Sequence, residues 1–208
     1  MPSPEFALKA FSTLFVVVDP IGLVPMFVAL AGTRSHAAQA RIAREAVLIA
    51  GGVMFVFAFI GGPLLSYLGI SVAALRIAGG ILLFRIALDM VYAQVRRETP
   101  EEVAESQGRD DISVFPLAIP LIAGPGTIAS VLILAGDTGG STEAFGVILA
   151  AGAAVLALAY LFLRLAPRIA KLLGQTGINV VTRLLGLILA ALSVQYVADG
   201  IATMINGI

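Results

Sequence analysis

The sequence VVVDPIGLVPMF, residues 16–27, is an apolar run interrupted by an aspartate, two prolines and a glycine. In a membrane, proline removes one helical hydrogen bond and frees backbone groups that hydrocarbon cannot satisfy. Such a break persists only where protein or a water-filled cavity meets the freed groups. The stretch therefore predicts a broken membrane helix, with Asp19, Pro20 and Gly22 at a position of functional interest.

The composition of the whole chain is typical of a membrane protein. Of its 208 residues, 59% are hydrophobic and 12% are charged, and the mean hydropathy is +1.01. The 13 basic and 13 acidic residues cancel, so the charge balance gives no indication of a nucleic-acid partner. The chain has no cysteine, which excludes disulfides and thiolate chemistry. We expect no cofactor and no metal site, and the bilayer itself is the expected environment.

Six apolar windows are long enough to be membrane spans, since about 20 residues cross the ~30 Å hydrocarbon core. The N-terminal sequence MPSPEFALKA lacks the features of a cleaved secretory signal, so we expect the first window to be retained. The loops after the first, third and fifth windows carry most of the basic residues. By the positive-inside rule these loops are cytoplasmic and both termini lie outside. The windows are 8–30, 46–68, 71–95, 112–136, 144–165 and 177–205.

The two halves of the chain contain related motifs in the same order. Pro20-Ile-Gly-Leu-Val-Pro25 corresponds to Pro120-Leu-Ile-Ala-Gly-Pro125, and the RIAG motif at Arg76 corresponds to RLLG at Arg183. Each half has three spans, so the second half must enter the membrane from the opposite side. We therefore expect an all-α membrane protein of two inverted three-helix repeats in a single membrane domain. Their ranges are 1–95 and 112–208, with a charged cytoplasmic linker at 96–111.

The first and fourth windows are both broken by proline near their middles. A half-helix that begins at the membrane midplane presents unpaired N–H groups and the positive end of its dipole, which suits a carboxylate. Gly124-Pro125-Gly126-Thr127, after the break marked by Pro120, predicts such a start. Paired breaks at corresponding positions favour the substrate site of a transporter, and simple packing kinks are the alternative.

From the sequence, Asp19 has no expected partner within its own helix. We expect it to cap the half-helix opened by Pro20 or to act as a proton- or cation-linked acid. Arg76 and Arg183 are its candidate long-range partners.

Two further polar features lie within the third and sixth windows. Arg85 and Asp89 are four residues apart on one helix face, which predicts a self-neutralised structural pair. Gln195 is a candidate cavity-lining residue, with a hydrogen bond between helices as the alternative.

Four motifs resemble the MarC family, which includes the SnatA small neutral amino acid transporters. They are FxxLFxxxDPIGxxPxF at 11–27, RIAGGILL at 76–83, PLAIPLIAGPGTI at 116–128 and RLLGLILAALSVQYVADGI at 183–201. The resemblance implies a bacterial or archaeal cytoplasmic (inner) membrane protein of six spans with inverted repeats. For the SnatA branch it implies proton-linked transport of glycine or alanine.

The family motifs fall on specific residues of this chain. The DPxG motif falls on Asp19, Pro20 and Gly22, and the GPG motif falls on Gly124, Pro125 and Gly126. The chain departs from the family at Leu23, where many members have asparagine, and this leaves the exact substrate open.

These observations favour a secondary transporter of a small zwitterionic amino acid, with alternating access around a midplane site. The substrate carboxylate would meet the half-helix start near residues 124–127, and Asp19 would receive the ammonium group or carry the proton. Export of other small solutes or drugs is the alternative, since the family name alludes to multiple antibiotic resistance. Direction, coupling ion and oligomeric state, including a homo-oligomer, are left open.

Two other classes of protein fit the sequence less well. An intramembrane enzyme is disfavoured because the single histidine, His36, lies in a basic loop and supplies no buried dyad. A channel is disfavoured because the helices show neither a continuous polar lining nor charged rings. The chain has no nucleotide-binding loop, so it is not expected to be an ATP-driven pump by itself.

Overall fold

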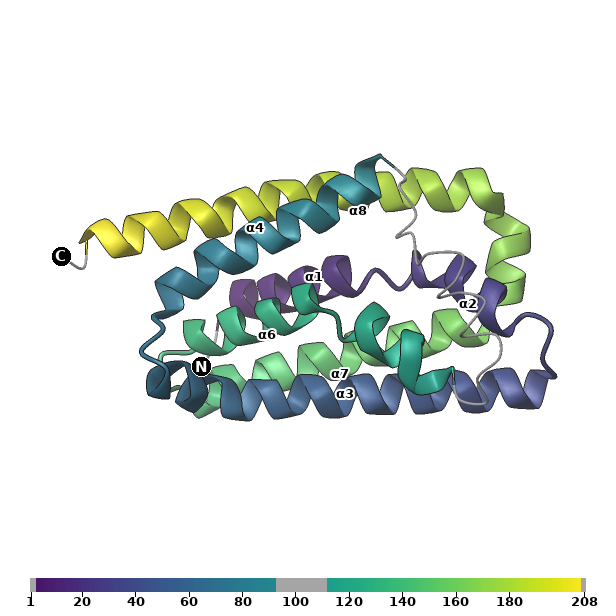
Figure 1. Cartoon of the computed structure of the whole chain (residues 1–208), viewed down its shortest axis with the longest axis horizontal. Coiled ribbons are helices and arrows are strands. Elements are labelled where there is room, and N and C mark those ends of the chain that lie inside the picture. The colour runs from purple at the N-terminus through teal and green to yellow at the C-terminus, as the bar shows by residue number, and fades with distance from the viewer. Residues whose placement is uncertain (1–2, 93–111, 207–208) are drawn as a thin grey trace.

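The computed structural model describes residues 3–92 and 112–206, and the regular structure in these ranges is helical. The helices form one elongated bundle (Figure 1). The expected linker at 96–111 lies outside the described residues. In chain order the helices are α1 (Pro4–Val18), α2 (Leu23–Ala31), α3 (His36–Tyr67), α4 (Val72–Val91), η1 (Ser113–Ile122), α6 (Pro125–Asp137), α7 (Thr142–Arg164) and α8 (Ala166–Asn206).

The helices α3, α7 and α8 are each long and apolar enough to cross a membrane. The pairs α1 with α2 and η1 with α6 also qualify if each is counted as one broken span, bent by 41° and 53° respectively. The helix α4 is not counted because it carries three charged residues, Arg76, Arg85 and Asp89. The described residues are thus helical, with three to five candidate membrane spans, and the breaks lie where the prolines predicted them.

Two helices begin earlier than the apolar windows indicated. The helix α3 starts at His36 rather than near residue 46, because the Ser35 hydroxyl caps it by accepting the Ala38 N–H at 3.3 Å. The intervening alanine, glutamine, arginine and glutamate residues are good helix formers. The helix α8 starts at Ala166 rather than near residue 177, and it is interrupted at Gly174, whose φ of 62° is not helical.

The helices α4 and α8 run side by side along one face of the bundle (Figure 1). They approach closely because glycines lie at the contact. A Cβ atom at Gly80 would be 2.7 Å from the Ser193 carbonyl oxygen, and one at Gly200 would be 2.8 Å from the Ala73 carbonyl oxygen. Small residues at such contacts allow the van der Waals packing that holds membrane helices together.

The first broken segment lies in the interior of the bundle. The helix α1 contacts α6, α7 and α8, and α2 contacts α7, α8 and η1. Leu14 and Val24 are fully buried on either side of the break, and Phe27 is 1% exposed. The break is therefore surrounded by protein, which is the setting in which freed backbone groups can be satisfied.

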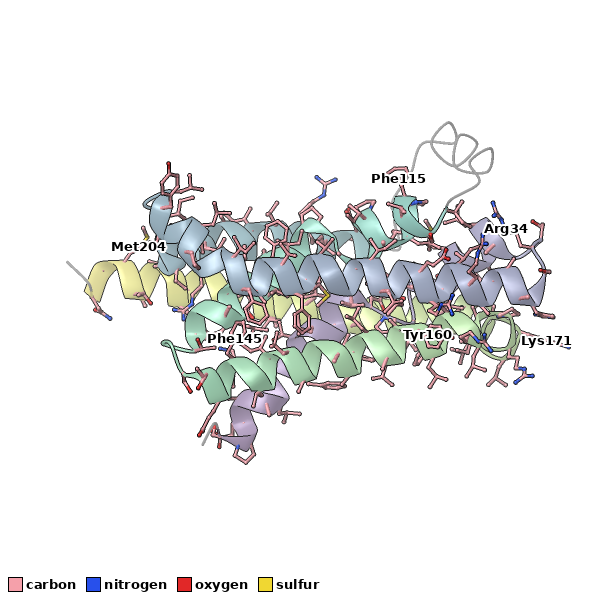
Figure 2. All side chains as sticks on the ribbon, turned by 90° about the horizontal axis from the view of Figure 1, so that it is seen from below. Arg34, Phe115, Phe145, Tyr160, Lys171 and Met204 are labelled. Carbon is pink, nitrogen blue, oxygen red and sulfur yellow. The ribbon has the colours of Figure 1, made fainter. Side chains whose placement is uncertain are left out.

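The two ends of the bundle differ in charge and in chain termini. Arg34 and Lys171 lie at one end, whereas Met204 of α8 lies at the other (Figure 2). The beginning of α1 lies toward the same end as the end of α8 (Figure 1). We call the end with Arg34 and Lys171 the basic end, and the end with Met204 the terminal end.

Candidate functional site

Asp19 forms the corner between α1 and α2. Its backbone has φ 45° and ψ 67°, a left-handed conformation that aspartate adopts more readily than most residues. Its N–H donates to the Phe15 carbonyl at 3.0 Å, which ends α1, and its carbonyl accepts from Leu23 N at 3.1 Å, which begins the next helical turn. One residue thus ends one helix and starts another.

The Asp19 side chain also stabilises this corner. Its Oδ1 atom accepts the Gly22 N–H at 3.0 Å, three residues further along, in the pattern of a helix N-cap. This agrees with the expected capping role. A Cβ atom at Gly22 would lie 2.7 Å from the Asp19 carboxyl carbon, so only glycine leaves the carboxylate in place.

The second break lies between η1 and α6. Phe115 and Ile119 have extended backbone angles inside η1, because each precedes a proline, Pro116 or Pro120. Gly124 is the N-cap of α6, with no side-chain capping bond, and Pro125 occupies the first turn. The Thr127 hydroxyl donates to the Ile122 carbonyl at 2.8 Å. The hydroxyl that was expected to bind a ligand is therefore already bonded to the backbone.

A cavity of about 470 Å³ lies beside the first break. Its polar groups are the carboxylates of Asp19 and Asp89 and the side chains of Gln175, Asn179 and Thr182 on α8. None of the described residues that line it is basic. The other lining residues are Val17, Val18, Gly22, Leu23, Pro25, Met26, Ala29, Ile86, Met90, Leu121 and Ile178.

The polar groups of the cavity are partly bonded to one another or to neighbours. The Gln175 Nε2 atom donates to Asn179 Oδ1 at 3.0 Å, which orients the Asn179 amide. The Thr182 hydroxyl has no hydrogen-bond partner among the described residues. Asp89 pairs with Arg85, whose Nε lies 3.4 Å from Asp89 Oδ1, and this confirms the expected i,i+4 pair. The arginine is far more exposed than the aspartate, 77% against 27%, so the acid is the cavity-facing member.

The structure brings only some of the predicted site residues to this cavity. Asp19, Gly22 and Asp89 line it. Pro20 and Pro120 do not line it, and neither do Gly124, Pro125, Gly126 and Thr127. A Cβ atom at Gly126 would be 2.6 Å from Ile86 Cδ1 and 3.5 Å from Val17 Cγ1. These two side chains belong to the cavity wall, so the start of α6 lies one apolar layer behind it.

The other predicted polar residues also lie elsewhere. Gln195 is exposed and donates to Asp199 Oδ1 at 2.6 Å on the same helix, so neither cavity lining nor a bond between helices is observed. Arg183 is exposed on α8. Arg76 pairs with Asp137 of α6 rather than with Asp19, because it lies in the first turns of α4, far along the helix from the cavity.

Asp137 is the centre of an ion-pair cluster at the terminal end of the bundle. Lys9 Nζ lies 2.9 Å from Asp137 Oδ2, and Arg76 pairs with the other carboxylate oxygen. Arg76 also contacts the Thr203 hydroxyl of α8 at 3.4 Å. We call these four residues the terminal cluster. They join α1, α4, α6 and α8, and the Asp137 side chain is only 11% exposed.

Sequence reasoning did not identify Asp137 or the polar residues of α8. Asp137 follows an apolar window and resembles an ordinary solvated residue at a helix end. Gln175, Asn179 and Thr182 do show a signal, since their spacing of four and three residues places them on one helix face. Gln175 lies outside the predicted window of 177–205, so that window contained only two of these three residues.

The chain is similar to a known family of membrane proteins and to proteins of bacteria and archaea. A family model described as MarC family integral membrane protein matches residues 5–205. A UPF0056 membrane protein of Archaeoglobus fulgidus is 39% identical, covering 95% of this chain and 93% of its own. The UPF0056 membrane protein YvbG of Bacillus subtilis is 39% identical, and the match covers 96% of this chain and 96% of the relative. The UPF0056 membrane protein YhcE of Escherichia coli is 35% identical, and the match covers 96% of this chain and 94% of the relative. No solved structure matches the chain.

Proposed function

Because the chain belongs to the MarC family of integral membrane proteins, we propose that it is a secondary transporter of small neutral amino acids such as alanine and glycine. The observation that carries the proposal is the cavity beside the Asp19 corner, where a helix break, two carboxylates and three neutral polar side chains share one space. Discontinuous helices around a central cavity are typical of transporter substrate sites.

The charges of the cavity support a substrate with a cationic group. Asp19 and Asp89 both line it, and no described lining residue is basic. An ammonium group that entered the cavity would meet these two acids and could form charge-assisted hydrogen bonds with their carboxylate oxygens. Asp19 would receive this group or carry a coupled proton, since a carboxylate can exchange protons with water in the cavity.

The proposed topology has six spans in two inverted repeats, α1 to α4 and η1 to α8, with both termini outside the cytoplasmic membrane. In this arrangement α4 is the third span, added to the five candidates that qualify by length and hydropathy. Its charges have partners, because Arg76 pairs with Asp137 and Arg85 pairs with Asp89. Pairing lowers the cost of charged side chains in a membrane helix. The paired breaks, one in each half, support the repeat.

Alternating access requires that only one end be open at a time. The cavity is lined by Asp89 and Met90 near the end of α4 and so lies toward the basic end, whereas Arg76 of the terminal cluster lies near the start of the same helix. At 1.5 Å per residue the positions of Arg76 and Asp89 are about 20 Å apart along the axis. We propose that this state faces the cytoplasm and that the terminal cluster closes the outer end.

The experiment that tests the function is uptake of radiolabelled alanine and glycine into proteoliposomes, with and without an imposed pH gradient. The matched variant is Asp19→Asn, which keeps an oxygen to accept the Gly22 N–H and removes the charge. We expect saturable, gradient-stimulated uptake by the native protein and loss of most of it in the variant. Absence of uptake by native protein in either orientation would exclude amino-acid transport.

A second candidate is export of larger, more apolar solutes. It is favoured by the apolar majority of the cavity lining and by a volume of about 470 Å³, within the range of pockets for drug-sized molecules. The two candidates separate in one assay, because a drug exporter would move an apolar cation against its gradient and leave alanine outside.

A further inference from the structure

We propose that the polar stripe of α8, formed by Gln175, Asn179 and Thr182, is a subsite that binds the carboxylate of the substrate through neutral hydrogen-bond donors. The proposal rests on the proposed function and assigns one end of the zwitterion to named side chains. It also replaces the start of α6 as the carboxylate site.

Among its described lining residues, the cavity has none of the cationic side chains that usually bind a carboxylate. A carboxylate is usually bound by arginine, lysine or exposed backbone N–H groups. No described residue lining the cavity is basic, and residues 124–127 at the start of α6 do not line it, with Ile86 and Val17 packed against Gly126. Among the described lining residues, the side-chain donors left for a carboxylate are neutral, and all three of these side chains belong to α8.

Two of these three side chains have hydrogen-bond donors left to bind a ligand. The bond from Gln175 Nε2 to Asn179 Oδ1 uses the acceptor of the Asn179 amide, so its NH₂ group is the part left to bind a ligand. The Thr182 hydroxyl has no partner among the described residues. A polar group shielded from water without a partner costs free energy, which a ligand oxygen would recover.

The three polar side chains and the two carboxylates of the cavity come from different helices. Gln175, Asn179 and Thr182 recur at helical spacing, so they present one polar row along α8. The Asp19 and Asp89 carboxylates come from α1 and α4. A zwitterion can thus place its ammonium at the acids and its carboxylate at the α8 row.

The experiment measures two ligands against the same variants. In proteoliposomes, competition against labelled alanine gives the affinity for unlabelled alanine and for alaninamide, which keeps the ammonium and lacks the carboxylate. Thr182→Val removes the hydroxyl at constant shape, and Asn179→Asp places a negative charge in the row. We expect both variants to lower the affinity for alanine by about tenfold or more, the range for a hydrogen bond to a charged group. The affinity for alaninamide should stay within about twofold of the native value. In Asn179→Asp it should be higher, because the added charge attracts the ammonium group.

Two control variants separate the explanations. Thr182→Ser keeps the hydroxyl and should restore alanine affinity, which a purely structural role of the methyl group would not predict. Gln195→Leu changes an exposed residue of the same helix and should match the native protein. If native protein transports alanine but Thr182→Val and Asn179→Asp resemble Gln195→Leu, the subsite is wrong and the transporter stands. If native protein transports neither glycine nor alanine, the proposed function fails and the subsite with it.

Discussion

Lys9 Nζ lies 2.9 Å from Asp137 Oδ2, joining the beginning of α1 to the last residue of α6 across 128 positions of sequence. The second oxygen of the same carboxylate pairs with Arg76 of α4. One acid therefore holds together three helices at the terminal end, and its side chain is only 11% exposed, which limits screening by water.

Asp137→Asn is expected to loosen the terminal end. The change removes the charge that both Lys9 and Arg76 face, and a shift of ~1.4 kcal/mol would raise the open population tenfold. Because the chain has no cysteine, the measurement is labelling of a single Ser130→Cys reporter by a membrane-impermeant thiol reagent. Ser130 is fully buried on α6, two turns before Asp137.

The control for this experiment is Arg85→Gln, which breaks an ion pair near the opposite end of α4 and should leave reporter labelling unchanged. Equal labelling of the reporter in the native and Asp137→Asn backgrounds would show that the terminal cluster does not close the outer end.

The orientation in the membrane gives a paired prediction. Thr33→Cys, in the loop between α2 and α3, and Thr142→Cys, at the start of α7, change exposed residues at opposite ends of the bundle. With both termini outside, an impermeant reagent added to intact cells should label residue 142 and spare residue 33 until the membrane is permeabilised. The reverse pattern would invert the proposed topology and place the cavity toward the exterior.

Gly22→Ala should disable the Asp19 corner. The new methyl group would occupy the space of the Asp19 carboxylate, so the carboxylate must swing away from the Gly22 N–H and from its place in the cavity wall. We expect uptake to fall by about tenfold or more and stability to fall by ~1 kcal/mol, the value of a lost cap. Gly52→Ala is the matched control, because a Cβ atom there meets nothing within 4 Å.

Asp19→Ala and Asp19→Asn should differ in stability although both remove the charge. Alanine removes the acceptor of the Gly22 N–H and should cost about 1 kcal/mol, whereas asparagine keeps an acceptor and should cost little. The measurement is thermal unfolding in detergent of the native protein and both variants. Equal stability of the two variants would mean that the capping bond contributes nothing to the fold.

Gly80→Ala should separate α4 from α8. The added carbon would lie 2.7 Å from the Ser193 carbonyl oxygen, which belongs to helical backbone and cannot rotate away. Overpacking of this kind costs typically ~1–3 kcal/mol, so the unfolding temperature should drop. Gly62→Ala on α3, where a Cβ atom meets nothing within 4 Å, provides the comparison and should be neutral or slightly stabilising.

The sequence predicted the helical fold and the two breaks well, because proline and glycine act locally. Asp19 was predicted as a candidate site residue on similarly local grounds, since an acid beside a proline in an apolar run has few structural explanations, and it lines the cavity. The helix α3 begins before its apolar window because hydropathy measures burial in lipid, whereas Ser35 and the helix formers after it extend the helix beyond the window.

The site itself could be predicted only in part. The prolines show where the fourth window breaks but not what packs against the break, so the Ile86 and Val17 side chains in front of Gly126 were not foreseen. The pairing of Arg76 with Asp137 spans 61 residues, and no periodicity within either helix encodes it. The α8 stripe was readable from spacing, but three neutral polar residues are weaker evidence than one buried acid.

The terminal cluster also bears on how the protein is assembled. Synthesis from the N-terminus places Lys9 and Arg76 in the chain before their partner Asp137 exists, 61 residues after Arg76. Until α6 inserts, both cations would reach for lipid headgroups and water at the membrane surface, as long basic side chains do. The nascent first half would then be held with its α1 start and α4 start at one surface, and the arrival of Asp137 would exchange these lipid contacts for protein contacts. These ion pairs would thus form only when α6 has inserted. A chain lacking Asp137 should therefore remain longer in contact with the insertion machinery.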